Sequence, residues 1–352
     1  MPQKSRTSSR CSLNLFKRSF FFATIALLVT ISSMSFGWTI NSRELVDVQF
    51  ASDDTLIILV SAPHAVEPGI YHWPPGASAA SPLCRIASPT SFSFDRKTII
   101  ERVAGLAPEL RLYSPSDCRL LDRIKLDGDV LDADARGKLV AVALRLPDQA
   151  TELRIHATSA TRVKNASALA RAVIGRNVEM GFAPDGRSIV NFDLSDGGAA
   201  AWRVPSLATA ALPTWMAEGE TTFVPGSTFV KRYLKGSMSV ARWPDGSAIY
   251  TMPSLRNVRL RQLSATGRYG VLHSADALDA AGQSLDWIDF ATQKRARLAT
   301  GSIDHAAIHA AGKRVAWVLR SGENADQVSV EFAQIDADGS TISTNVDTEA
   351  RR

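Results

Sequence analysis

A histidine pair near the C-terminal end of the chain is a candidate for metal binding or a pH-dependent contact. His305 and His309 are four positions apart, so in an extended strand their side chains share one face. Neutral imidazole is a common metal ligand, and its titration near neutral pH suits a pH-dependent contact. A metal site needs a third ligand, which the neighbouring sequence does not supply. We therefore interpret His305 and His309 as two polar residues that face water in a central channel of the fold.

Two acidic fragments look like partial calcium loops. The first runs from Asp132 to Gly137, but Arg136 stands where a third ligand is needed and Ala143 where the bidentate Glu is needed. The second, from Asp336 to Gly339, is more simply a hairpin turn. No nucleophile elbow, phosphate loop or dinucleotide fingerprint occurs in the sequence. The sequence therefore predicts no catalytic residue and no cofactor.

Two periodic series in the sequence indicate the strands and turns that carry these residues. Short apolar runs end in an aromatic residue or histidine every 40 to 46 residues, at Trp73, Tyr113, His156, Trp202, Trp243, Trp287 and Phe332. Turn signals recur in step with them, near 54, 96, 137, 186, 226, 267 and 312. A period in the low forties with strand and turn chemistry in each unit is typical of a β-propeller. We predict an all-β fold of seven four-stranded antiparallel blades over residues 44–345, with a tail at 346–352.

The strands after these turns are continuous Val, Ile and Leu runs, as at Leu56–Val60 and Leu139–Leu144. Such runs are expected of strands buried on both faces, here between adjacent blades. The segment from Phe182 to Ile189 contains Pro184-Asp185-Gly186 and resembles the turn of WD40-like repeats of the TolB type. The segment from Trp243 to Ile249 is similar, but we place its turn after the third strand. The resemblance implies a propeller in an extracytoplasmic setting and transfers no activity.

The first 38 residues are predicted to be a signal peptide or a signal anchor. Five basic residues precede an uncharged apolar run, predicted to be helical, that begins at Phe20. Ser33 and Ser35 suit a cleavage after Ser35, whereas an uncut span from Phe20 to Trp38 is just long enough to cross a bilayer. Both alternatives place the propeller outside the cytoplasm, in the periplasm of a Gram-negative cell. Export also allows Cys84 and Cys118 to pair, the alternative being two separate thiols.

Charge is distributed unevenly over the predicted blades. Outside the N-terminal segment the chain has 35 basic and 35 acidic residues, so it lacks the basic surface of a nucleic-acid binder. The stretch from Arg136 to Arg268, however, holds 18 basic and 9 acidic residues. Within it the long segment from Ala157 to Val178 is predicted to bind an envelope protein or an anionic membrane surface, through Arg162, Lys164, Arg171 and Arg176.

These observations favour a non-catalytic protein-binding or scaffolding module of the cell envelope. The alternative is a ligand- or metal-binding propeller enzyme whose site lies at the mouth of the central channel. In that case His305 and His309 would form its polar centre.

Overall fold

The computed structural model describes residues 37–342, apart from 42–44, 62–67, 87, 89, 149, 159–167, 175–179, 193–198, 219, 235, 254–256, 275–281, 322–326 and 337–340. The apolar segment that the sequence predicts as a helix, and the tail at 346–352, lie outside these residues. Within them, no helix has the length and apolarity that a bilayer span needs. The one helix is a 3-10 turn, η1 (Thr214–Glu218).

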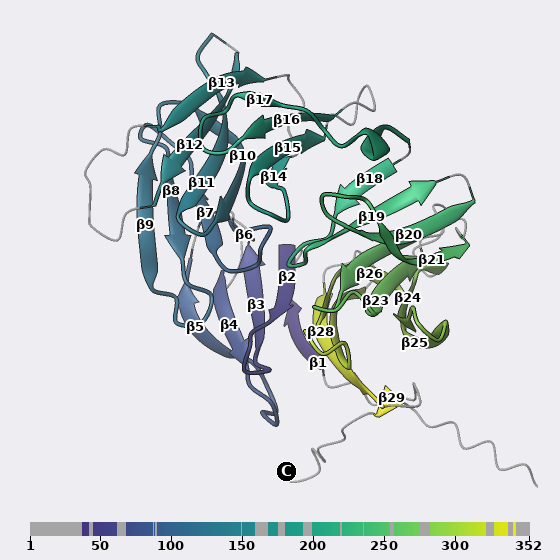
Figure 1. Cartoon of the computed structure of the whole chain (residues 1–352). Helices are drawn as coiled ribbons and strands as arrows, with labels where there is room; N and C mark the ends of the chain where they lie inside the picture. The colour runs from purple at the N-terminus through teal and green to yellow at the C-terminus, as the bar shows by residue number, and fades with distance from the viewer. Residues whose placement is uncertain are drawn as a thin grey trace, which may run out of the picture. The chain divides into compact units, whose positions relative to one another are not determined.

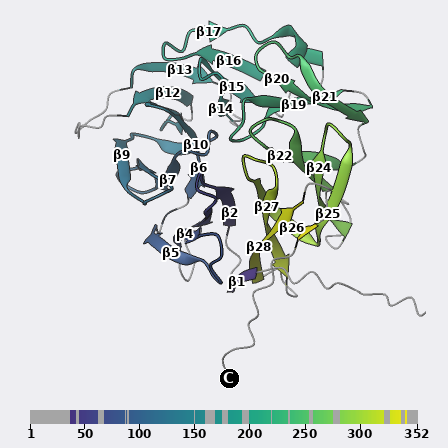
Figure 2. The same cartoon turned by 60° about the horizontal axis from the view of Figure 1, so that its bottom comes forward.

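The propeller consists of seven antiparallel sheets that follow one another around a ring (Figures 1 and 2). Inner strands of neighbouring blades contact one another at β10 with β14 and at β22 with β26, and β2 of blade 1 meets β26 of blade 7. This confirms the predicted all-β, seven-bladed fold.

The strands of each blade are given from the inner to the outer strand. Blade 1 consists of β2 (Leu45–Phe50), β3 (Leu56–Ser61), β4 (Gly69–Trp73) and β5 (Ser81–Arg85). Blade 2 consists of β6 (Thr90–Phe92), β7 (Ile99–Val103), β8 (Glu109–Tyr113) and β9 (Leu120–Lys125), and blade 3 of β10 (Asp129–Arg136), β11 (Leu139–Arg145), β12 (Thr151–Ala157) and β13 (Ala170–Ile174).

Blades 4 to 7 continue in the same order. Blade 4 consists of β14 (Met180–Phe182), β15 (Ser188–Phe192), β16 (Ala199–Arg203) and β17 (Thr209–Ala210), and blade 5 of β18 (Glu220–Phe223), β19 (Phe229–Leu234), β20 (Ser237–Arg242) and β21 (Ala248–Pro253). Blade 6 consists of β22 (Val258–Leu263), β23 (Tyr269–Ser274), β24 (Ser284–Asp289) and β25 (Lys294–Thr300). Blade 7 consists of β26 (Ser302–Ile308), β27 (Arg314–Ser321), β28 (Gln327–Ile335) and, as outer strand, β1 (Gly37–Asn41).

Blade 7 is completed from the other end of the chain. β1 pairs antiparallel with β28, from Gly37 opposite Glu331 to Asn41 opposite Gln327. Farther along the same strand, β29 (Thr341–Ile342) pairs with Ile335 and its neighbour. The ring therefore takes in a strand that precedes residue 44, the predicted start of the propeller. In the sequence this strand continues the apolar segment, and nothing in its composition separates it from that segment.

The second strands are buried on both faces, as their apolar runs predict. All six residues of β3 are buried. Ile57 and Leu59 pack with Ile99 of blade 2, whereas Ile58 and Val60 pack on the other side with residues of blade 7 such as Val318 and Val330. Alternate side chains of one strand thus serve two neighbouring blades, which accounts for the absence of polar alternation.

Both periodic series occupy the predicted places. The aromatic or histidine positions lie in the third strands, or directly after one in the case of Trp243. The turn positions join first and second strands, and the turn at Trp243 to Gly246 joins β20 to β21 as predicted. Gly312 in the blade 7 turn has a φ of +81°, and a Cβ there would lie 2.1 Å from Tyr269 of blade 6. Close packing between blades therefore requires glycine at this turn.

Candidate functional site at the channel mouth

A cavity of about 500 Å³ lies at the level of the turns that join first and second strands. Its volume is within the range of small-ligand pockets, about 300 to 1,000 Å³. Blades 1, 2, 5, 6 and 7 form its walls with Val48, Gln49, Phe50, Ala51, Ser52, Ile57, Asp95, Arg96, Lys97, Ser114, Pro115, Ser116, Pro225, Gly226, Gln262, Leu263, Ala265, Ala307, Ile308 and Ala310. Apolar side chains with a few amides and charges are the usual lining of a binding pocket.

The turn of blade 5 reaches across to blade 2 beside this cavity. The Gly226 amide donates a hydrogen bond of 2.7 Å to the carbonyl of Phe94. Below it the rings of Phe94 and Phe223 meet edge to face, with centroids 5.8 Å apart. These blades stand three places apart in the ring, so protein crosses the channel at this level.

Gln49 on β2 lines the cavity and carries a buried acceptor without a partner among the described residues. Gln49 is only 7% exposed, and its Nε2 donates a hydrogen bond of 2.9 Å to the carbonyl of Arg96. Among the described residues, Oε1 of the same amide has no hydrogen-bond partner. A buried acceptor without a donor costs about 1 to 3 kcal/mol, so a ligand that brings an N–H or O–H to this point gains free energy. Lys97 is exposed beside it.

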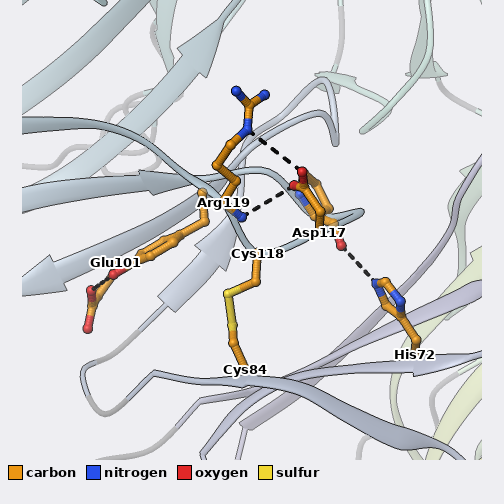
Figure 3. Close-up of a disulfide and its surroundings, with 8 residues drawn as sticks. His72, Cys84, Glu101, Asp117, Cys118 and Arg119 are labelled. Carbon is orange, nitrogen blue, oxygen red and sulfur yellow. Dashed lines mark hydrogen bonds and ion pairs between the residues drawn. A yellow bond between two sulfur atoms is a disulfide. The ribbon is translucent and has the colours of Figure 1, made fainter. Parts of the chain in front are cut away.

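A disulfide fastens one wall of the cavity (Figure 3). Ser114, Pro115 and Ser116 lie in the turn between β8 and β9, and Cys118 of this turn is bonded to Cys84 on β5. The ring of His72 makes a second link, 3.0 Å from the carbonyl of Pro115. From the sequence, the pairing of Cys84 with Cys118 stayed open, because the outer strands of neighbouring blades splay apart and a disulfide needs the two Cα atoms close together. It forms because Cys118 precedes β9, in a left-handed turn position with a φ of +54°, with the two Cα atoms 6.2 Å apart.

The two candidate metal-binding histidines contact separate carboxylates. His305 on β26 places Nδ1 3.4 Å from Oδ1 of Asp47, whereas His309 follows the strand and places Nε2 2.7 Å from Oδ1 of Asp54. A register shift in β26 between Ile303 and Ala306 disturbs the simple alternation on which the prediction depended. Within the described part of the chain, no three His, Cys, Asp or Glu side chains gather in a way that could hold a metal ion.

The carboxylates of the calcium-like fragment join blades. Asp134 on β10 is 3% exposed, and it accepts backbone hydrogen bonds of 2.7 Å from Phe94 of blade 2 and 2.8 Å from Phe182 of blade 4. Burial raises its pKa to about 6. Asp132 accepts from the Met180 amide at 3.0 Å and pairs with Arg102, and burial raises its pKa as well. These side chains hold three inner strands together.

The predicted partner-binding residues are only partly within the described chain. Arg171 lies on β13 with 55% of its side chain exposed, whereas Arg162, Lys164 and Arg176 fall outside the described residues. Two other arginines of the same basic stretch form ion pairs with nearby carboxylates of this chain. Arg154 is buried against Glu152, and Arg268 pairs with Asp289 at 2.8 Å, which lowers the pKa of that carboxyl.

No protein-family profile matches the sequence, and no curated protein matches it significantly. A chain in a solved structure titled "Crystal Structure of Mitotic Checkpoint Complex" is 9% identical, with a TM-score of 0.51 over 91% of this chain and 98% of that chain. The protein has a seven-bladed β-propeller fold. A putative 6-phosphogluconolactonase from Bacteroides fragilis is 15% identical, with a TM-score of 0.48 over 83% of this chain and 94% of that chain. At these identities the likeness concerns the fold alone.

Sequence reasoning missed Gln49 and the bridging role of Asp134. Each sits in a first strand among residues that could face either a channel or a neighbouring blade, so its type alone does not reveal its partner. A buried amide or carboxylate next to a predicted turn is the signal that could have indicated them, since such groups require hydrogen-bond partners.

Proposed function

We propose that the protein is an extracytoplasmic β-propeller that acts as a non-catalytic protein-interaction module of the cell envelope. The observation that carries this proposal is the use of charged side chains near the channel. Asp132 and Asp134 bind the backbone of neighbouring blades, and Arg96 pairs with Asp47 of blade 1 at 2.9 Å. Groups used in this way make a rigid frame, and rigid frames commonly present recognition loops and edges to partners.

The disulfide supports the proposed location. Disulfides persist in oxidising compartments and are rare in the cytosol. The Cys84–Cys118 bond joins two blades, and it agrees with an export segment before Gly37. We propose that the protein is extracytoplasmic, in the periplasm if the source is Gram-negative, either exported or anchored in the inner membrane.

The partner-binding side is proposed to be basic, and a charge reversal tests it. Changing Arg162, Lys164 and Arg171 together to Glu should weaken association with envelope membranes at low salt, because attraction between exposed charges is screened beyond about 8 Å at physiological ionic strength. The measurement is co-sedimentation with protein-containing envelope membranes, and with vesicles of phosphatidylglycerol alone. Retention on the vesicles alone identifies lipid as the partner.

A reversal at Arg295 and Arg297 provides a control, because it reverses the same kind of charge on β25, the outer strand of blade 6. If the triple variant sediments with envelope membranes as the unchanged protein does, the basic side is solvated surface and the proposal for it fails.

The unpartnered Oε1 of Gln49 favours a second candidate, binding of a small polar ligand in the channel-mouth cavity. Such a ligand would present a hydrogen-bond donor to Oε1 and an anionic group to Lys97. Thermal unfolding in a panel of small hydroxy acids and amino acids tests it, with Gln49→Met as the variant that removes the acceptor at similar volume. A stabilising compound that acts equally on both proteins would contradict a role for Gln49.

A further inference from the structure

The outer edge of β13 differs from that of five other outer strands, whereas β1 likewise pairs over five residues without a register shift. In β5, β9, β21 and β25 the pairing with the third strand contains a register shift, and β17 has only two residues. β13 pairs with β12 over five residues without a shift, from Thr151 opposite Ile174 to Ile155 opposite Ala170. Register shifts, very short strands, prolines and charges are the usual means of protecting an edge from another chain. Apart from Arg171, β13 has none of them.

The two faces of this strand have different surroundings. Ala170, Ala172 and Ile174 pack with residues of blade 4, including Leu207 and Trp202. On the other face Leu169 is 55% and Val173 is 78% exposed, with Arg171 between them. Figure 2 shows β13 at the outer side of its blade, and among the described strands only β12 pairs with it. An unpaired edge beside exposed apolar side chains is the arrangement that strand addition uses.

We propose that the free edge of β13 docks an extended segment of a partner protein, which pairs with it as a fifth strand of blade 3. This inference rests on the proposed interaction function and names the surface and the kind of partner. On the face of Leu169, Arg171 and Val173 the segment would carry an apolar, an acidic and an apolar residue at every second position, because alternate residues of a strand share a face. Its apolar side chains would cover Leu169 and Val173, and a carboxylate between them would face Arg171.

Charge favours an acidic partner over a second copy of this chain. Arg171 lies 3.9 Å from Glu152, which already binds the buried Arg154, so the exposed end of the Arg171 side chain retains capacity for another acid. If two copies of β13 paired antiparallel with full overlap, their Arg171 side chains would be diagonal neighbours on one face. Like charges at such a distance repel, whereas an acid at the same place is attracted.

The test uses a short acetylated and amidated peptide of sequence Val-Thr-Glu-Thr-Val, which places Val, Glu and Val on one face of a strand, added to the full-length protein. Hydrogen exchange followed by mass spectrometry should show slower exchange over residues 168–174, by about tenfold at a peptide concentration near 1 mM, which corresponds to a weak single-strand contact. The matched peptide with Lys in place of Glu should leave exchange there unchanged. In Arg171→Glu the preference should reverse, because the charge facing the peptide has changed sign.

Leu169→Ser together with Val173→Ser should abolish the protection. The matched control is Leu120→Ser together with Leu121→Ser on β9, where the two leucines are 40% and 38% exposed but the strand pairs with a register shift. No protection of 168–174, or protection indifferent to peptide charge, would overturn the proposal. A dimer in light scattering that Val173→Ser dissolves would overturn it in favour of self-association. The peptide needs no native partner, so its failure leaves the membrane-association test of the proposed function standing.

Discussion

The junctions on either side of blade 1 are fastened in different ways. Toward blade 2 the rim is joined covalently by Cys84 and Cys118, and the turn it fixes forms a wall of the cavity. Toward blade 7 the contacts between described residues are non-covalent. Ile58 and Val60 pack with Val318 and Val330, Asp54 meets His309 at 2.7 Å, and Trp73 meets Phe332 edge to face at 5.2 Å. Blade 7 itself depends on β1 for its outer strand. The ring is therefore expected to open first between blades 7 and 1.

Removing β1 should have the largest effect. Deleting residues 37–41 leaves the edge of β28 unpaired over five residue pairs. At about 0.5 to 1.5 kcal/mol for each hydrogen bond, the loss of stability should be about 3 to 5 kcal/mol. Thermal unfolding followed by circular dichroism measures it, and a truncation of residues 346–352 is the control for shortening the chain. Equal melting temperatures for the two truncations would show that β1 does not close the ring.

Breaking the disulfide should have a slightly smaller effect. Cys84→Ser with Cys118→Ser releases a bond that spans 34 residues, which should cost about 3 to 4 kcal/mol through the entropy of the unfolded chain. Denaturant unfolding with and without reductant measures it. Reductant should destabilise the unchanged protein and leave the double variant unaffected. A double variant as stable as the oxidised protein would mean that the two junctions of blade 1 are equivalent.

The buried carboxylate of Asp134 links blades 2, 3 and 4 by hydrogen bonds, and its contribution to stability depends on pH. Its pKa is raised to about 6 in the folded protein, so the folded state binds more protons than the unfolded state between about pH 4 and 6. Stability from this group is present below its unfolded pKa and falls as pH rises through the folded pKa, by at most about 3 kcal/mol. The stability of the unchanged protein relative to Asp134→Asn should therefore fall from pH 4 to pH 7.

Chemical unfolding across this pH range gives the comparison, with Asp148→Asn in an exposed turn as the control for losing a carboxylate. A difference that rises with pH would contradict the raised pKa. It would instead show that the backbone donors to Asp134 favour its charged form more strongly than burial opposes it.

The smallest effect is expected at the contact between blades 7 and 1. Asp54→Asn weakens the links to His309 and to Arg314, whose Nη1 lies 3.7 Å from Oδ2. Asp54 is 46% exposed, so the loss should be no more than about 1 kcal/mol. Asn suits the φ of +67° at this turn, so the variant changes charge with little backbone strain. A loss as large as that from deleting β1 would move the weakest point of the ring to this turn.

The fold could be predicted because its determinants are local and repeated. Each turn, and each run such as Leu56–Val60, carries its signal within a few residues. β1 could not be recognised because its partner, β28, lies almost 300 residues away and nothing in Gly37–Asn41 specifies it. The Cys84–Cys118 bond stayed open for a related reason, since it depends on how far one turn reaches toward another blade.

The candidate site was less predictable than the fold. His305 and His309 were singled out by residue type, but a register shift and two different acids, Asp47 and Asp54, determine what they contact. Gln49 gave no signal because an amide in a strand has many ordinary roles. The edge of β13 depends on the absence of a register shift, which only the paired strands can reveal.

The bond from the Gly226 amide to the Phe94 carbonyl also has a mechanical meaning. A circle of blades that touch only their neighbours can be flattened into an oval at little cost, because each joint needs to bend only slightly. A strut between two members on different parts of the circle resists that deformation, since squeezing along its direction compresses packed aromatic rings. Load applied at the rim of blade 2 is therefore passed directly to blade 5, as well as through blades 3 and 4.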